Sequence, residues 1–250
     1  MQDTTVFVTG ASAGFGAAIT RRFAAAGARV VASARRAGRL TDLARELGAR
    51  VLPVELDVRD HAAVDRAVHG LPADFAEIDV LVNNAGVALG LEPAQSADLG
   101  QWEQMLDTNC RGLMYCTRAI VPGMVTRGRG HVINLGSVAA TYPYPGGNVY
   151  GATKAFVRQL SLNLRSDLHG TGVRVTCVEP GMSETEFSLV RFGGDREKAG
   201  AVYAGMQPLT AQDVAEAVFW AATRPAHVNV NAIELMSVAQ SFAAFQVHRA

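Results

Sequence analysis

The segment Thr5-Val-Phe-Val-Thr-Gly-Ala-Ser-Ala-Gly-Phe-Gly16 decides the fold class, because a short apolar run leads directly into a glycine-rich loop. Its first residues are typical of a strand buried on both faces. Gly10, Gly14 and Gly16 permit a tight turn and a close approach to the backbone, and Gly14 opens a helical pattern. A helix that begins there offers backbone N–H groups and a positive dipole end to a phosphate. The segment therefore predicts a strand, a phosphate-binding turn and a helix.

The same alternation of short apolar runs and helical patterns continues along the 250 residues. It predicts one α/β domain, a Rossmann-type doubly wound parallel sheet of about seven strands with helices on both faces. We expect strands at Thr5–Val8, Arg29–Ala34, Val51–Leu56, Val80–Asn83, His131–Leu135, Arg174–Val178 and Ala232–Met236.

Helix boundaries follow from capping residues. The first helix should run from Gly14 to Ala26 and end at Gly27, and a long helix should cover Val149 to Leu168 and stop before Gly170. Further helix starts are predicted at the N-cap residues Asp60, Asp98 and Thr210.

Composition excludes several classes of partner. The chain has 23 basic and 23 acidic residues, which predicts neither nucleic-acid nor membrane-surface binding. Cys110, Cys116 and Cys177 form no CxxC pair and are expected to be buried, reduced thiols, which suits the cytoplasm. The strand-like start shows no secretory signal pattern. The six histidines have no metal-ligand spacing, so no metal site is expected.

The stretch Tyr150-Gly-Ala-Thr-Lys154 carries the chemistry. A spacing of four places the phenol and the ammonium on one helix face, where the positive charge favours the phenolate and lowers the tyrosine pKa. Ser137 lies upstream, at the end of a predicted strand. Singly, a helical Tyr/Lys pair is more often a surface pair; together with the glycine loop, these residues predict proton transfer beside a redox coenzyme.

In this order and spacing the chain resembles the short-chain dehydrogenase/reductase family over essentially its whole length. The matching pieces are Thr9-Gly-Ala-Ser-Ala-Gly-Phe-Gly16, Asn83-Asn-Ala-Gly86, Asn109, Ser137, Tyr150 with Lys154, and Pro180-Gly181. The stretches Gly146–Arg158, Thr185-Glu-Phe, Val190-Arg-Phe192 and Pro225–Asn231 resemble its subgroup of NADP-dependent 3-hydroxy acid dehydrogenases. That subgroup includes serine and L-allo-threonine dehydrogenases and malonic semialdehyde reductases.

The resemblance implies a role for each matching residue. Tyr150 exchanges the proton, Ser137 binds the substrate oxygen, Lys154 binds the nicotinamide ribose, and Asn109 holds a water that links Lys154 to solvent. Coenzyme contacts are implied at Gly10, Ser12, Gly14, Phe15, Gly16, Asp57, Val58, Asn83, Asn84, Ala85, Gly86, Pro180, Gly181 and Thr185. For Asn83 and Asn84, hydrogen bonds that pin neighbouring strands are an alternative role.

Charge favours NADP as the coenzyme. NAD-binding folds usually carry a carboxylate at the end of the second strand, but here Ala34 is followed by Arg35 and Arg36. Two guanidiniums can clamp a 2′-phosphate, although they are also compatible with a solvated surface. Ala13 occupies a loop position where many NADP-using relatives have a basic residue, so selectivity should rest on Arg35, Arg36 and the Ser12 hydroxyl.

The polar segment 182–207 should form a loop over the carboxyl ends of the strands and act as a substrate lid, or else be an ordinary surface excursion. Within it Arg191 is the candidate for binding a small anionic substrate, with Arg196 and Lys198 as weaker candidates. Arg249, in the C-terminal tail, could instead reach a neighbouring subunit, and solvated surface arginines are the alternative for both Arg191 and Arg249.

We expect an NADP-dependent oxidoreductase that exchanges a hydride with a small 3-hydroxy acid or its semialdehyde or keto form. Sulfoacetaldehyde reduction, reduction of neutral or acyl-carrier-bound carbonyls, and a non-catalytic NADP sensor are the alternatives. The family resemblance also implies a homotetramer, built through helices near Asp98–Arg118 and Val149–Leu168, to which the tail Ala239–Val247 could add.

Overall fold

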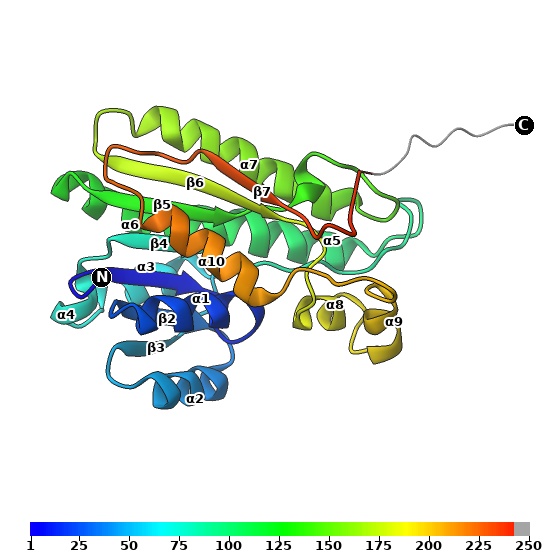
Figure 1. The fold of residues 1–250 in the computed structure, drawn as a ribbon, viewed down its shortest axis with the longest axis horizontal. Helices are drawn as coiled ribbons and strands as arrows, with labels where there is room; N and C mark the ends of the chain where they lie inside the picture. The colour runs from blue at the N-terminus through cyan, green and yellow to red at the C-terminus, as the bar shows by residue number, and fades with distance from the viewer. Residues whose placement is uncertain (243–250) are drawn as a thin grey trace, which may run out of the picture.

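Seven parallel strands form one sheet in the order β3-β2-β1-β4-β5-β6-β7, in a computed structural model that describes residues 1–242 (Figure 1). The strands are β1 (Thr5–Thr9), β2 (Arg29–Ala34), β3 (Val51–Glu55), β4 (Val80–Asn83), β5 (Gly130–Leu135), β6 (Val173–Pro180) and β7 (Ala232–Leu235). All seven predicted strands are present, with ends that differ by at most two residues, and the doubly wound order confirms the predicted fold class.

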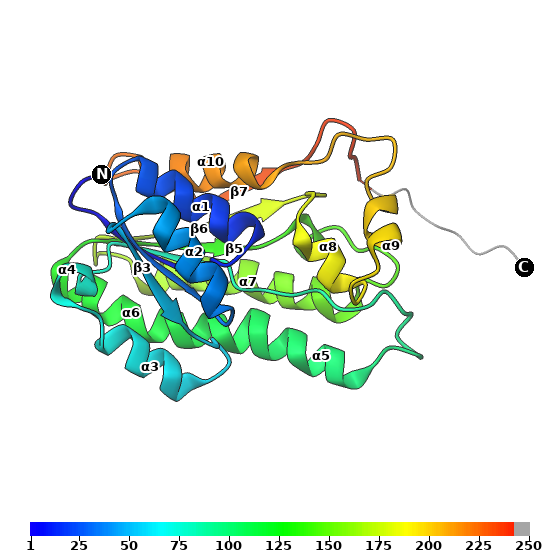
Figure 2. The same ribbon diagram turned by 90° about the horizontal axis from the view of Figure 1, so that it is seen from below.

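Helices cover both faces of this sheet, as Figure 2 shows. One layer contains α1 (Gly14–Ala25), α2 (Ala37–Leu47) and α10 (Ala211–Ala222). The other contains α3 (His61–His69), α5 (Leu99–Leu106), α6 (Leu113–Arg127) and α7 (Asn148–Asp167), and the short α4 (Ala73–Ala76) precedes β4. Each face has its own apolar core, because successive strand residues point to opposite sides: Val6 and Val8 pack toward α1, and Phe7 packs toward α6.

The helix starts follow the predicted caps. The side chains of Asp60, Asp98 and Thr210 each accept a hydrogen bond from the backbone N–H three residues later. Thr210 and Asp213 form a complete capping box. Gly27 adopts φ +88°, a left-handed conformation that glycine tolerates, and the chain turns there from α1 into β2.

Two segments differ from their predicted form. The helix expected near Asp98–Arg118 contains a π-helical stretch, Asp107–Gly112, between α5 and α6. The segment 182–207, expected to be a loop, contains the short helices α8 (Glu186–Arg191) and α9 (Arg196–Ala201). Asp195 caps α9 and Thr185 caps α8 through their side chains, which is the local signal that the polar composition concealed.

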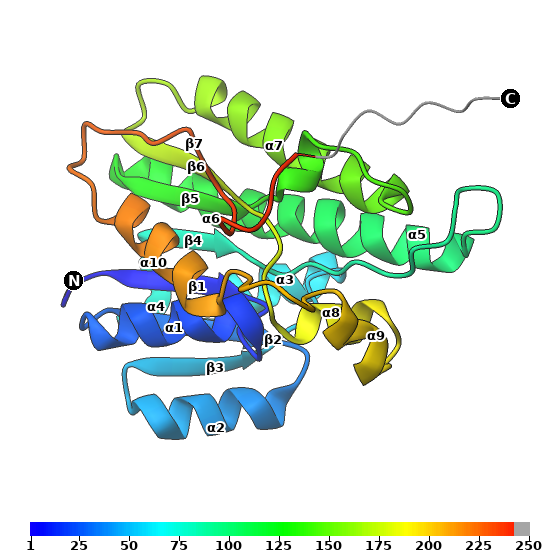
Figure 3. The same ribbon diagram turned by 45° about the vertical axis from the view of Figure 1, so that its right-hand side comes forward.

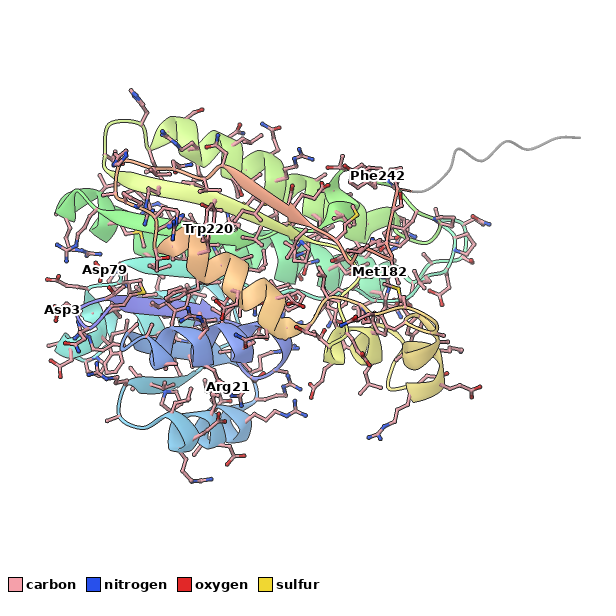
Figure 4. All side chains as sticks on the ribbon, in the orientation of Figure 1. Asp3, Arg21, Asp79, Met182, Trp220 and Phe242 are labelled. Carbon is pink, nitrogen blue, oxygen red and sulfur yellow. The ribbon has the colours of Figure 1, made fainter. Side chains whose placement is uncertain are left out.

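Helices α8 and α9 of the segment 182–207, the predicted lid, lie beyond the carboxyl ends of the strands (Figure 3). Figure 4 shows Met182, which follows β6, at the opposite end of the sheet from Asp79, which precedes β4. Ligands of open α/β sheets bind at the carboxyl ends, so the segment after β6 is placed to cover such a ligand. Within residues 1–242, no helix has both the length and the apolar character needed to span a membrane.

Candidate active site

A cavity of about 730 Å³ opens at the carboxyl ends of the strands, between the sheet and the lid. Most of the predicted site residues line it: Gly10, Ser12, Gly14, Phe15, Arg35, Arg36, Asp57, Val58, Asn84, Ala85, Gly86, Ser137, Tyr150, Lys154, Pro180, Gly181, Thr185 and Arg191. Three predicted contact residues, Gly16, Asn83 and Asn109, are not among the lining residues. One continuous cavity therefore joins the glycine loop to the Tyr150 side chain.

The glycine loop brings backbone, rather than side chains, to the cavity. Gly10 and Gly14 adopt φ +68° and +50°, which side chains other than glycine rarely tolerate. A Cβ atom on Gly16 would lie 2.3 Å from the Gly10 carbonyl oxygen, so this glycine permits the turn to pack on itself. Ala13 provides no side-chain cap for α1, and the first turn has no acidic residue. The N-terminal N–H groups of α1 therefore fit a pyrophosphate.

Asn83, the last residue of β4, and Asn84, which follows it, make different contacts. Asn83 is buried and donates to the side chains of Asn134, at 2.9 Å, and Thr117, at 3.0 Å. Asn84 donates to the Thr9 carbonyl oxygen at 2.8 Å and also lines the cavity. Asn83 thus links β4 to β5 and lies behind the cavity wall, whereas Asn84 links β4 to β1 and also lines the cavity.

The end of β2 carries the predicted cations. Arg36 Nε donates to the Ser12 hydroxyl at 3.0 Å, which joins two of the three predicted selectivity residues. Its Nη1 donates to Glu186 of the lid at 3.0 Å, and Glu186 also accepts from Arg39 at 2.7 Å. Asp57, at the end of β3, accepts from Arg59, and this hydrogen bond holds the pKa of the Asp57 carboxyl below its ordinary value.

Ser137 and Tyr150 meet at the far end of the cavity. Ser137 caps a 3₁₀ turn, Val138–Ala140, by accepting from the Ala139 N–H at 3.1 Å, which fixes its hydroxyl after β5. Tyr150 lies in the first turn of α7 and is 8% exposed. The Tyr150 ring packs with Phe187 of the lid, with ring centroids 5.7 Å apart. Tyr150 and Ser137 thus line the same cavity, and the Phe187 ring helps to cover the phenol.

Burial governs the pKa values of both groups of the Tyr150/Lys154 pair. It raises the pKa of Tyr150 to about 12, against the opposing effects of the Ser137 hydroxyl and the Arg191 charge. Lys154 lies 5.8 Å from the Tyr150 ring centroid, donates to the Leu135 carbonyl oxygen at 2.7 Å, and has its pKa lowered by burial to about 8. The expected lowering of the tyrosine pKa by this pair is therefore absent in the protein chain itself, because desolvation of the phenolate is the larger effect.

Asn109 lies in the π-helical stretch and is 2% exposed. Its amide donates to the Val87 carbonyl oxygen at 2.9 Å and to the Thr153 hydroxyl at 3.0 Å, and its Oδ1 accepts from the Val87 N–H at 2.8 Å. The side chain therefore joins the β4 exit loop to α7. Its role in holding a water near Lys154 stays a prediction.

The lid brings Arg191 next to Tyr150. Its guanidinium carbon lies 5.6 Å from the Tyr150 ring centroid, and its Nη2 donates to the Tyr144 hydroxyl at 2.7 Å. The weaker candidates Arg196 and Lys198 lie on α9, outside the lining of the cavity, and Lys198 faces Asp195. Arg249 and the tail beyond 242 lie outside the described residues. Among Arg191, Arg196 and Lys198, the three that lie within residues 1–242, Arg191 has the geometry to bind an anion beside Tyr150.

Several cavity residues were missed by the sequence analysis. Glu186 and Tyr144 line the cavity, and Arg39 bonds Glu186. Gln240 Oε1 accepts from the Met182 N–H at 2.7 Å and so supports the segment after Pro180. The spacing of Arg36 and Arg39, three apart at a helix start, was a usable signal for a shared face; the other contacts join distant segments.

The three cysteines are buried free thiols, as predicted. Burial raises the pKa of Cys110 to about 11 and that of both Cys116 and Cys177 to about 12. Neutral thiols of this kind pack as small apolar side chains.

Known proteins resemble this chain over its full length. The family model described as short chain dehydrogenase matches residues 4–191. An NADP-dependent 3-hydroxy acid dehydrogenase of Salmonella typhi is 61% identical over 245 residues, which cover 98% of this chain and 99% of the relative. A serine 3-dehydrogenase of Rhizobium radiobacter is 54% identical and covers 98% of both chains.

Solved structures agree. The closed form of a serine dehydrogenase complexed with NADP+ has a TM-score of 0.98 at 57% identity, covering 99% of this chain and all of that one. A serine dehydrogenase from Escherichia coli has a TM-score of 0.86 at 53% identity, covering 96% of this chain and all of that one.

Proposed function

The chain belongs to the short-chain dehydrogenase family, and we propose that it is an NADP-dependent dehydrogenase of small 3-hydroxy acids. It exchanges a hydride between the nicotinamide coenzyme and the hydroxy acid or its semialdehyde or keto form. The relatives named as 3-hydroxy acid and serine dehydrogenases support this activity. The observation that carries the substrate class is the position of Arg191 beside Tyr150.

NADP would lie along the cavity from Arg35 and Arg36 to Tyr150. The N-terminus of α1 would hold the pyrophosphate, and the two arginines with Ser12 would hold the 2′-phosphate. Asp57 and Val58 would flank the adenine. Asn84, Ala85 and Gly86 would line the adenosine side, while Pro180, Gly181 and Thr185 would contact the carboxamide end. Bound NADP supplies the hydride acceptor and donor.

The protein's own residues handle the proton. Burial raises the pKa of Tyr150 to about 12, so the phenol is protonated at neutral pH and would give its proton to the substrate oxygen during reduction. Ser137, whose hydroxyl acts against burial to lower the Tyr150 pKa, would stabilise charge on that oxygen. In oxidation the nearby positive charge of Arg191 favours the phenolate that would accept the proton. Asn109, through Thr153, would keep Lys154 and Tyr150 in register on α7.

Arg191 would grip the acidic group of the substrate. A guanidinium can bind a carboxylate with two parallel hydrogen bonds, and in a partly buried site this contact is strong. Tyr144 holds the guanidinium on one side, and the Gly90 carbonyl oxygen accepts from Nε at 3.3 Å on the other. The chain would therefore be a single domain, 1–250. Its residues 182–207, which contain Arg191, would act as a lid over the bound substrate.

Steady-state rates of NADP+ reduction test the substrate class. The acids are L-serine, L-allo-threonine and 3-hydroxypropionate, with isethionate as the sulfonate and neutral secondary alcohols as the comparison. A preference in kcat/KM for the acids supports the proposal. A preference for isethionate would instead indicate a sulfoacetaldehyde reductase. If only neutral alcohols react, the proposed specificity for acids is wrong.

We also propose that the protein is a cytoplasmic homotetramer. Apolar side chains exposed on the helices expected to build the tetramer support this: Leu99 and Leu106 on α5, Met114 on α6, and Phe156 and Leu162 on α7. Light scattering with size-exclusion chromatography would test the tetramer, and a monomer at micromolar concentration would contradict it. Cell fractionation of the tagged protein tests the compartment.

A further inference from the structure

Glu186, the first residue of lid helix α8, bridges two arginines of the segment that follows β2. It accepts from Arg36 Nη1 at 3.0 Å, and both of its carboxylate oxygens lie 2.7 Å from Arg39 Nη1. Arg36 also donates to Ser12 of the glycine loop. One guanidinium is therefore shared between the glycine loop and the lid.

The Arg36 guanidinium is also the group that would bind the 2′-phosphate of NADP. A carboxylate and a phosphate bind the guanidinium fork in the same way and repel each other. The side chains of Arg36, Arg39 and Glu186 are 46%, 48% and 42% exposed, so a ligand can reach them. Ion pairs of this exposure are weak, and a phosphate with nearly two charges can displace one.

Arg39 differs from Arg36 in position. Arg36 and Glu186 line the cavity, whereas Arg39 lies outside its lining. Arg39 also has the shorter contacts to the Glu186 carboxylate. If a phosphate takes Arg36, the carboxylate keeps a partner on α2.

We propose that Glu186 is an internal competitor of the coenzyme 2′-phosphate for Arg36, and that Arg39 retains Glu186 once the phosphate is bound. Glu186 and Arg39 are then residues that set coenzyme affinity and keep the lid attached to α2. Thr185 and Phe187, on either side of Glu186, face the glycine loop and the Tyr150 ring. The ion pair between Glu186 and Arg39 thus connects the adenosine end of the cavity to the lid. This inference rests on the proposed use of NADP.

Calorimetric titration of the full chain with NADP+ and with NAD+ tests the competition. The variants are Glu186→Gln, Arg39→Met and the double variant, with Glu184→Gln as a control that removes an exposed lid charge of the same sign. Glu186→Gln should bind NADP+ roughly three- to fivefold tighter, with NAD+ affinity unchanged. An NADP+ affinity no tighter than that of Glu184→Gln overturns the competition.

Arg39→Met should weaken NADP+ binding, because Glu186 is left on Arg36. The double variant should regain the affinity of Glu186→Gln. A loss that persists in the double variant would make Arg39 a phosphate ligand and overturn its assignment. If the unchanged protein binds NADP+ no tighter than NAD+, the proposed coenzyme fails instead, so the two failures are distinguishable.

Limited trypsin digestion gives a second readout, since the lid contains Arg191, Arg196 and Lys198. With NADP+ bound, Glu186→Gln and Arg39→Met should both be cleaved faster in the lid than the unchanged protein and Glu184→Gln. Equal cleavage rates would overturn the attachment of the lid. Circular dichroism melting curves identify a variant that fails to fold.

Discussion

Arg191 of the lid lies next to Tyr150 of α7 in the cavity, with the guanidinium carbon 5.6 Å from the centroid of the tyrosine ring. The two residues are 41 positions apart, and neither belongs to the glycine loop. Their proximity places a fixed cation next to the group that would transfer the proton. The relationship gives the substrate one end for chemistry and one end for charge recognition.

Arg191→Ala should raise KM for the preferred acid roughly 10- to 100-fold, the loss expected for a charge-assisted hydrogen bond. KM for a neutral alcohol should change little. Arg196→Ala is the matched control, because Arg196 lies on the same lid outside the cavity lining. Equal increases for acid and alcohol would remove Arg191 from anion binding.

Tyr150→Phe should lower kcat by roughly two to four orders of magnitude, because only the proton-transferring hydroxyl is lost. The ring still packs against Phe187, so the cavity keeps its shape. NADPH fluorescence titration should show an unchanged coenzyme affinity. A variant that retains activity would contradict the assignment of the proton to Tyr150.

Arg36→Ala should weaken NADP+ binding by about tenfold or more, while NAD+ binding stays the same, because only NADP carries the 2′-phosphate. Arg45→Ala is the control: Arg45 lies on the same helix and pairs with Asp42 in solvent. Calorimetric titration measures both affinities. A parallel loss for NADP+ and NAD+ would show that Arg36 acts on the fold of the loop rather than on the phosphate.

Lys154→Met should abolish activity and yet stabilise the fold at pH 7. Burial lowers the Lys154 pKa from 10.5 to about 8. The charged ammonium therefore lowers the free energy of unfolding by about 3 kcal/mol at pH 7. The lost hydrogen bond to the Leu135 carbonyl oxygen offsets part of this gain. The native state releases its proton at lower pH than the unfolded chain, so the advantage should shrink from pH 8 to 10.5.

Urea unfolding at several pH values measures that difference. A variant that is less stable than the unchanged protein at pH 7 would show that the ammonium's hydrogen bond outweighs its desolvation. Unfolding must be compared without coenzyme, because a ligand of the native state adds its own stabilisation.

His131→Leu should make the fold less sensitive to acid. Burial, and secondarily Arg174, lowers the pKa of His131 to about 3, whereas an unfolded histidine titrates near 6.5. Below pH 6.5 the unfolded chain therefore binds a proton at this histidine that the native state does not bind. At pH 5 this difference lowers the free energy of unfolding by about 2 kcal/mol. Thr176, the partner of His131, still donates to the Val230 carbonyl oxygen. Melting temperatures that fall equally with pH in both proteins would contradict this.

The amino-acid sequence was enough to predict the fold class and to propose the reacting groups. Short continuous apolar runs, Gly27 at φ +88° and the caps Asp60 and Thr210 are local features, so they can be read residue by residue. The same holds for Gly10 and Gly14, whose backbone conformation demands glycine, and for Tyr150 with Lys154 at helical spacing. The three buried free cysteines also agree with the prediction.

The tertiary structure alone decided how these groups meet and how they titrate. Asn83 lies behind the cavity wall, Glu186 pairs with Arg36 and Arg39, and Arg191 lies beside Tyr150. Each of these contacts joins segments that are distant in sequence, so no local pattern could predict it. The rise in the Tyr150 pKa is likewise a collective effect, since desolvation depends on every chain segment that covers the phenol. Local patterns select residue types, whereas burial and long-range packing set their electrostatics.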